Sequence, residues 1–196
     1  MMKCHVILIA LLATGCATSP GPTTGDRGNE QIGRYSVIHR GPELEVSVGF
    51  SQGGRSIGEE WLIIAVEFMT PPRSDLTTVN RSDITAITPD GRRLALVSQN
   101  EYRGSFNTFR IRLERAMEIL PIFGRYETAV SPCNRWFLEG PFGGVAVDEI
   151  TVNTFQVCSG PLVFKVSGGV QPGRWRLIID LEESRVDIPF ELYADE

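Results

Sequence analysis

The chain has 196 residues, of which 19 are Lys or Arg and 24 are Asp or Glu, so its formal net charge is −5 at pH 7. This charge argues against nucleic acid and anionic membrane surfaces as electrostatic partners, because both need a basic face. The length suits one domain with a sizeable hydrophobic core, plus a tether. We therefore expect a single domain that does not bind nucleic acid.

The first fifteen residues are predicted to be a removable targeting signal that ends just before Cys16. Lys3 precedes a short apolar run, residues 6–12, and small residues lead up to Cys16. The run is too short to cross the ~30 Å hydrocarbon core as a helix, as is typical of secretory signals. No second apolar stretch of about 18 residues follows, so only lipid would hold the chain to a membrane.

The letters LATGC at positions 12–16 resemble the lipobox of bacterial lipoproteins. The resemblance implies that residues 1–15 are a signal peptide, and that Cys16 becomes the lipidated N-terminus of an envelope protein. By the same resemblance, Ala17 favours release to the outer membrane, facing the periplasm or the exterior. The alternative is an ordinary secretory signal that leaves Cys16 as an odd thiol.

The stretch after Cys16 is predicted to be a flexible tether over residues 16–42. Positions 17–30 contain no apolar side chain larger than Ala or Pro, so they cannot bury enough surface to become ordered. A random coil of this length has an r.m.s. span on the order of 25–30 Å. The folded domain is expected over residues 43–194.

Most of this domain alternates apolar and polar residues with period two, which predicts β-strands. The strand at 44–50 is expected to be half-buried, with Glu45 and Ser47 on the polar face, whereas 61–69 is apolar on both faces and therefore central. Pro189 lies on the outward face of the last strand, which suits an edge. The predicted strands are 44–50, 61–69, 83–88, 92–98, 135–138, 149–157, 162–167, 174–181 and 185–192.

One segment, residues 107–120, has helical periodicity instead. Its apolar residues recur at steps of three and four, with Ser105 or Asn107 as N-cap and Pro121 as the stop. The expected inward face comprises Phe106, Phe109, Leu113, Met117 and Leu120.

Short strands with turns between them and a single inserted amphipathic helix predict a mostly β fold, a two-sheet antiparallel sandwich. The closing hairpin, beginning with the letters PGRWRL at positions 172–177, resembles the end of an immunoglobulin-like domain. That resemblance covers the last quarter of the mature chain.

The two remaining cysteines, Cys133 and Cys158, are expected to form a disulfide, because two thiols in an oxidising compartment usually pair. Closing that loop would stabilise the domain by roughly 3.5 kcal/mol in the chain-entropy model. A redox-active pair is the weaker interpretation, since the Cys-x-x-Cys spacing is absent.

Few residues suggest enzymatic chemistry. The letters GRSIG at positions 54–58 match the Gly-x-Ser-x-Gly elbow of serine hydrolases around Ser56, but a strand follows where that elbow needs a helix. His39, the only His of the mature chain, lies upstream rather than downstream. A carboxylate such as Glu67 is the other hydrolase candidate. No metal site, cofactor or catalytic residue is predicted.

Aromatic residues gather around a turn at Glu139-Gly140-Pro141. Trp136, Phe137 and Phe142 offer large flat rings that can stack on a sugar or anchor a protein partner. In a strand, Trp136 and Phe137 would lie on opposite faces, so one would be core. We expect a non-enzymatic binding or assembly role with an envelope protein or cell-wall partner; the alternatives are a glycan- or peptidoglycan-binding module and a hydrolase.

Overall fold

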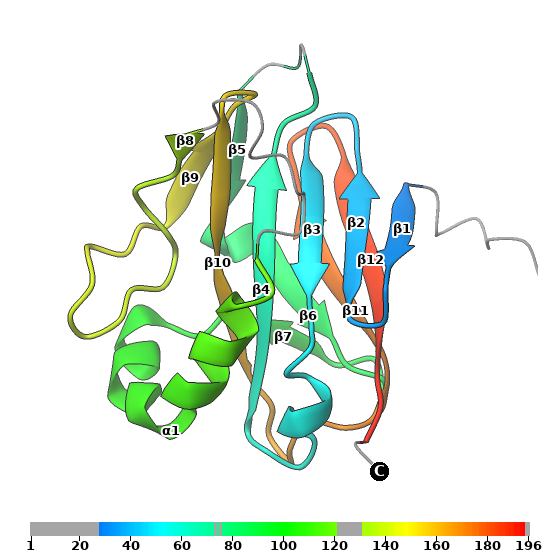
Figure 1. Cartoon of the computed structure of the whole chain (residues 1–196), viewed down its shortest axis with the longest axis vertical. Coiled ribbons are helices and arrows are strands. Elements are labelled where there is room, and N and C mark those ends of the chain that lie inside the picture. The colour runs from blue at the N-terminus through cyan, green and yellow to red at the C-terminus, as the bar shows by residue number, and fades with distance from the viewer. Residues whose placement is uncertain (1–27, 73, 75, 121–130, 195–196) are drawn as a thin grey trace, which may run out of the picture.

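The computed structural model describes residues 28–72, 74, 76–120 and 131–194, and this part of the chain is mostly β (Figure 1). One α-helix and two short 3-10 helices (η1, η2) interrupt the strands of the described residues. The elements are β1 (Asn29–Ile32), β2 (Ser36–Arg40), β3 (Glu45–Gly49), η1 (Gly54–Ser56), β4 (Trp61–Met69), β5 (Thr77–Asn80), η2 (Arg81–Asp83), β6 (Ile84–Ile87), β7 (Arg93–Ala95), α1 (Gln99–Met117), β8 (Ser131–Pro132), β9 (Glu149–Val152), β10 (Gln156–Lys165), β11 (Gly173–Asp180) and β12 (Arg185–Leu192).

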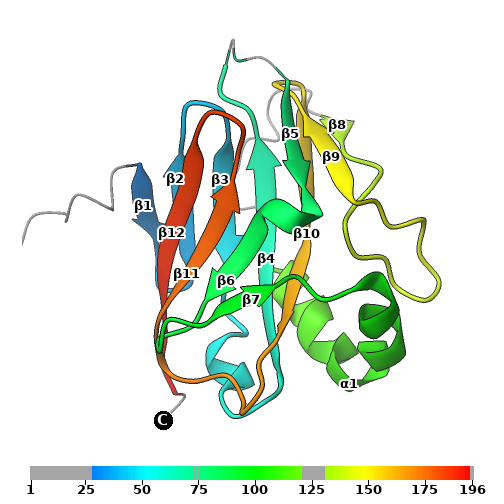
Figure 2. The same ribbon diagram turned by 180° about the vertical axis from the view of Figure 1, so that it is seen from behind.

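The strands form three sheets. The largest has the order β1-β2-β3-β4-β10-β8, the second β12-β11-β6-β7, and the third pairs β5 with β9. Every pairing is antiparallel except that of β10 with β8. The β12-β11-β6-β7 sheet lies behind the largest sheet in Figure 1 and in front of it in Figure 2, so the two form layers. This arrangement confirms a mostly β, antiparallel fold.

Strand β4 is the centre of the core, as its apolar sequence predicts. All nine of its residues are buried, and it is paired with β3 on one side and β10 on the other. The helix α1 packs against its first residues, where the rings of Trp61 and Phe109 lie 5.3 Å apart between centroids. Cover on both faces explains why this strand has no polar side apart from Glu67.

The two predicted hairpins are present. β11 and β12 pair over eight residues, and β12 is an edge strand that carries Pro189, as expected. β6 and β7 flank the turn at Gly91, whose positive φ of 85° suits a residue without a Cβ. The inward residues of β11 and β12 are all 3% exposed or less: Trp175, Leu177, Ile179, Val186, Ile188, Phe190 and Leu192.

The helix prediction was wrong in its boundaries. α1 begins eight residues earlier than expected. Its N-cap is Ser98 rather than Ser105 or Asn107, because the Ser98 hydroxyl accepts a hydrogen bond from the Glu101 backbone N–H at 3.2 Å. Its extra turns bury Tyr102, while Met117, the last residue, and Leu120 beyond it are only partly buried. The predicted stop at residue 121 lies outside the described residues.

The predicted tether extended too far into the domain. Residues 29–32 and 36–40 form β1 and β2, which add two strands to the edge of the largest sheet. β2 is ordered because it pairs with β3 and buries Val37 and Ile38. β3 in turn is buried on both faces, including Glu45 and Ser47, so the half-buried prediction was wrong. Ser47 is tolerated there because its hydroxyl donates to Glu67 of β4 at 2.9 Å.

The region after residue 148 is divided differently from the prediction. The expected strand 149–157 is broken at Asn153, whose side chain accepts the Phe155 amide at 2.8 Å and turns the chain. β10 then runs unbroken through Pro161, where we expected a gap. Pro161 fits because β8 pairs only with the first two residues of β10, so the missing N–H breaks no ladder bond on that side.

Candidate functional site

The segment after the disulfide is the part of the chain where sequence reasoning placed a binding site. Residues 135–138 are not a strand in the structure, so the predicted alternation does not apply. Trp136 and Phe137 are both buried, at 4% and 0% exposure, and are therefore excluded as surface contacts. Both rings turn inward because this stretch is irregular and no sheet fixes their directions.

Trp136 is held tightly by β10. Its indole N–H donates to the Pro161 carbonyl at 2.8 Å, and its ring lies 5.5 Å from that of Phe68. A Cβ on Gly160 would come within 2.3 Å of the ring, so only glycine leaves room for the indole at that position. Trp136 therefore fixes the start of the segment that follows.

Residues 139–148, which we call the Phe142 loop, are closed at their base. The Val147 amide donates to the Trp136 carbonyl at 3.1 Å, so the two ends of the loop are joined. Arg81 of η2 contacts both sides of this base: its guanidinium donates to the Phe137 carbonyl at 2.9 Å and its amide to the Asp148 carbonyl at 2.7 Å. Burial lowers the pKa of Arg81, and the Asp148 carboxylate opposes that shift.

The first turn of α1 holds the body of the Phe142 loop. The side-chain amide of Gln99 donates a hydrogen bond to the Glu139 carbonyl at 2.7 Å, and its oxygen accepts one from the Glu139 backbone N–H at 3.1 Å. Arg103 adds bonds to the Glu139 carbonyl at 3.4 Å and to the Gly144 carbonyl at 3.3 Å. Beneath them, burial raises the pKa of Tyr102 to about 12, with a further contribution from Glu139.

The tip of the Phe142 loop presents apolar side chains to solvent. Phe142 is 100% exposed and Val145 is 83% exposed. A short turn, in which the Gly143 amide donates to the Gly140 carbonyl at 3.0 Å, sets the backbone beside the ring. Because the backbone of the loop is already held, the ring can dock into a partner with little further loss of backbone conformational entropy. Of the three predicted binding residues, only Phe142 is placed to contact a ligand.

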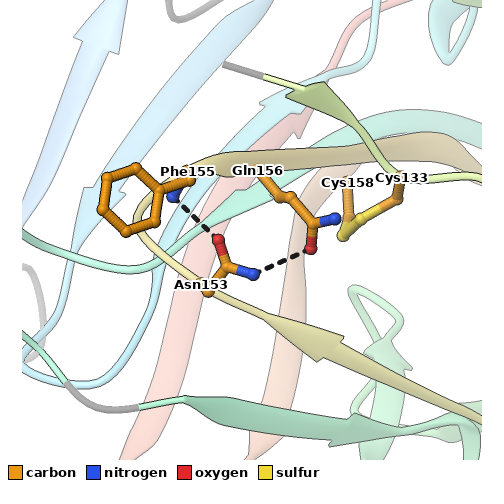
Figure 3. The surroundings of a disulfide bond; sticks show 5 residues. All are labelled: Cys133, Asn153, Phe155, Gln156 and Cys158. Carbon is orange, nitrogen blue, oxygen red and sulfur yellow. Dashed lines mark hydrogen bonds between the residues drawn. A yellow bond between two sulfur atoms is a disulfide. The ribbon is translucent and has the colours of Figure 1, made fainter. Parts of the chain in front are cut away.

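The predicted disulfide joins Cys133, just after β8, to Cys158 of β10, with their Cα atoms 4.7 Å apart (Figure 3). In Figure 3 the neighbouring turn holds Asn153 against Gln156, while Phe155 points away from the sulfur atoms. A small polar cavity of about 360 Å³ lies beside Cys133, lined also by residues 134, 135, 149–151 and 156. The disulfide therefore links the end of β8 to β10, its neighbour in the largest sheet.

The residues considered for a hydrolase are each used elsewhere. Ser56 is buried in η1, and its hydroxyl donates to the Gln52 carbonyl at 2.8 Å. His39 lies in β2 with Nδ1 2.9 Å from the Asn29 side-chain oxygen, and burial lowers its pKa, partly offset by Asp187. Glu67 accepts a hydrogen bond from the Ser47 hydroxyl, and the strand β4 follows Ser56 where a hydrolase elbow needs a helix.

The described residues contain neither a metal-binding cluster nor a membrane-spanning helix. In that part of the chain no three His, Cys, Asp or Glu side chains are grouped to hold a metal ion. No helix there is long and apolar enough to span a membrane. Cys16, the predicted lipidation site, lies outside the described residues.

Models of protein families, curated proteins and solved structures were all compared with this chain, and none matched. The evidence for the Phe142 loop as a binding site therefore comes from this sequence and structure alone. Sequence reasoning missed Gln99 and Arg103, because nothing in a helix start indicates which distant carbonyl it will contact. A partial signal was available at the N-cap, since Ser98 and Glu101 fit the Ser-x-x-Glu pattern of a helix start.

Proposed function

We propose that this chain is a lipid-anchored protein of the bacterial cell envelope whose domain binds another envelope component through the Phe142 loop. The observation that carries the proposal is the complete exposure of Phe142 on a loop that is fixed at its base and along α1. Exposed aromatic rings on rigid supports are the usual anchors of protein interfaces. The role is non-enzymatic.

The anchor in this proposal is lipid on Cys16, with the domain in the periplasm or at the cell exterior and the outer membrane as the attachment site. The support is the LATGC motif at positions 12–16 and its apolar run. Two or more acyl chains give stable attachment, so the protein should fractionate with membranes. Changing Cys16→Ser should release it into the soluble fraction; equal membrane retention would contradict the anchor.

The fold that we propose for the domain is an immunoglobulin-like sandwich. The two larger sheets would be its two layers. The β11–β12 hairpin is the part whose sequence resembles the end of an immunoglobulin-like domain. Such domains host many unrelated functions, so the fold favours a binding role without specifying the partner.

Crosslinking in intact cells tests the binding role. A photoreactive residue at position 142 should give one dominant crosslinked product, because the ring reaches solvent directly. Position 155 is the matched control, since Phe155 is also exposed, at 76%, but lies on the β9–β10 turn. Equal product patterns at the two positions, or none at 142, would contradict a specific partner at the Phe142 loop.

A glycan of the cell wall is the second candidate partner. The same exposed ring favours it, since an aromatic face can stack on a sugar ring. This candidate differs from a charged protein contact in its salt dependence, because ring stacking owes little to charge.

A further inference from the structure

We propose that the outer edge of β9 binds a short extended peptide, which adds a strand beside Glu149 and Thr151. The observation that carries this proposal is a set of main-chain groups on β9 that have no partner among the described residues and lie at a polar cavity. The Phe142 side chain does not line this cavity, so the proposal goes beyond the function proposed above and does not depend on it.

The register of β5 and β9 decides which main-chain groups are open. Antiparallel strands alternate between residue pairs that exchange main-chain hydrogen bonds and pairs that do not. The Arg81 backbone N–H donates to the Asp148 carbonyl at 2.7 Å, so the next hydrogen-bonded position on β9 is Ile150. The backbone N–H and C=O groups of Glu149 and Thr151 therefore point away from β5, and no strand of the described residues pairs with them on that side.

The polar cavity lies between β9 and the segment that follows β8. Residues 149–151 line it from one side and residues 133–135 from the other. The two segments meet where the Val147 backbone N–H donates to the Trp136 carbonyl at 3.1 Å. They separate beyond that bond, because the disulfide and a backbone hydrogen bond of 3.1 Å hold Cys133 to β10. The segments therefore enclose a cavity of about 360 Å³ instead of forming a ladder.

The neighbouring turn explains why this edge is left open. β9 and β10 are joined by only three residues, a length typical of a β-hairpin, yet they do not pair with each other. β8 pairs with the first two residues of β10 instead and occupies the edge that β9 would take. The Asn153 side chain bonds to Gln156 at 2.9 Å, which holds the turn beside the cavity (Figure 3). An added strand would give β9 the second neighbour that β10 does not provide.

The chemistry of the cavity fits a peptide. Besides the open main-chain groups, its lining carries the side chains of Asn134, Thr151 and Gln156, which can donate and accept hydrogen bonds. Arg135 and Glu149 add one charge of each sign, so charge alone selects neither an anion nor a cation. An extended peptide presents N–H and C=O groups at the spacing of a strand, which is the pattern that β9 can pair with. Because this chain bounds the cavity on two sides, a single segment fits there better than the sheet edge of a second copy.

NMR titration of the full-length protein in detergent tests the proposal. The probe is the capped peptide acetyl-Thr-Ala-Thr-Ala-Thr-amide, whose small side chains leave its main chain accessible. We expect it to shift the backbone amide signals of Glu149 and Thr151 more than that of Thr78, which lies on the far edge of the β5–β9 pair. An extended peptide points alternate N–H groups to opposite sides, so N-methylation of one alternate set should weaken binding about tenfold or more.

Two proline variants test the edge itself. Thr151→Pro removes an open N–H and places a ring at the cavity without breaking a bond to β5, so it should weaken peptide binding about tenfold or more. Thr78→Pro is the matched control, because Thr78 lies directly opposite Thr151 and its N–H points away from β9. Binding in this variant should equal that of wild type. Phe142→Ala should also bind the peptide as wild type does, which separates this proposal from the one for the Phe142 loop.

The N-methylated peptides are tested on wild-type protein, so their outcome holds even if Thr151→Pro does not fold. The proposal is overturned if wild type does not bind the parent peptide, or if both methylated peptides bind as tightly as the parent. It is also overturned if Thr78→Pro weakens binding as much as Thr151→Pro does. Self-association of wild type that is lost in a folded Thr151→Pro would overturn it as well, because the edge would then pair with a second copy.

Discussion

The β11–β12 hairpin and the Phe142 loop are both well supported, but by different interactions. The hairpin is held by an eight-residue backbone register and by alternate side chains that enter the core. The Phe142 loop has no such ladder, and it depends on side chains of α1 that reach its backbone from 36 to 41 residues away along the chain. Order in the hairpin is therefore encoded locally, whereas order in the loop depends on tertiary contacts.

The largest expected effect is on the hairpin. Trp175 of β11 is fully buried and its indole N–H donates to the Gln171 carbonyl at 2.9 Å. Trp175→Ala should lower the free energy of unfolding by about 3–5 kcal/mol, because it leaves a large cavity. Denaturant titration measures this change. Arg176→Ala, the next residue, removes an exposed ion pair with Asp187 and should cost less than about 1 kcal/mol. Equal losses in both variants would mean that Trp175 is not a core residue.

The disulfide encloses the Phe142 loop, since Cys133 and Cys158 are separated by 25 positions along the chain and flank it. Replacing both with Ser should lower the free energy of unfolding by about 3.5 kcal/mol in the chain-entropy model. Reduction of the wild-type protein should give the same loss. A non-reduced digest should show the two cysteine peptides joined in mass spectrometry. Recovery of two freely alkylated thiols from protein taken directly from the envelope would refute the pairing.

Gln99→Ala separates the two regions most directly. The substitution removes both hydrogen bonds to the Glu139 backbone and should cost about 1–2 kcal/mol locally. Amide exchange should become faster within residues 139–148 and stay unchanged in β11 and β12. Asn100→Ala is the control, because this neighbouring helical residue is exposed and forms no side-chain hydrogen bond with the described residues of the loop. Faster exchange in the hairpin as well would show that the two regions do not unfold separately.

The same contrast explains what sequence reasoning could predict. Strands β4, β11 and β12 were predicted because a strand that is buried on one or both faces carries apolar residues on those faces, and this pattern is visible in its own sequence. The start of α1 was missed because its first turns carry few apolar residues apart from Tyr102 and Phe106. Strands β1, β2 and β5 were missed because short strands owe their order to their neighbours.

The candidate site divides in the same way. Phe142 was singled out because an aromatic ring on a turn can stack on a sugar or anchor a protein partner, and it proved fully exposed. Trp136 and Phe137 were placed by alternation, which fails in an irregular segment, and both are core residues. The hydrogen bond that holds Trp136, from its indole N–H to the Pro161 carbonyl, joins residues that are 25 positions apart along the chain. Long-range juxtaposition leaves no local pattern in a sequence.

The smallest expected effect on stability is at the tip of the Phe142 loop. A substitution at this tip should instead have a large effect on binding. Phe142→Ala removes a side chain with no buried surface, so the free energy of unfolding should change by less than about 0.5 kcal/mol. Retention on purified cell-wall material should nevertheless be lost if the partner is a glycan, and wild-type retention should survive high salt. Phe155→Ala, an equally conservative change at another exposed ring, should be retained as wild type is. If wild-type protein fails to bind cell-wall material, the glycan is excluded and an envelope protein remains as the proposed partner. If a folded Phe142→Ala variant still gives the same protein crosslinks as wild type, the Phe142 loop is not the binding site.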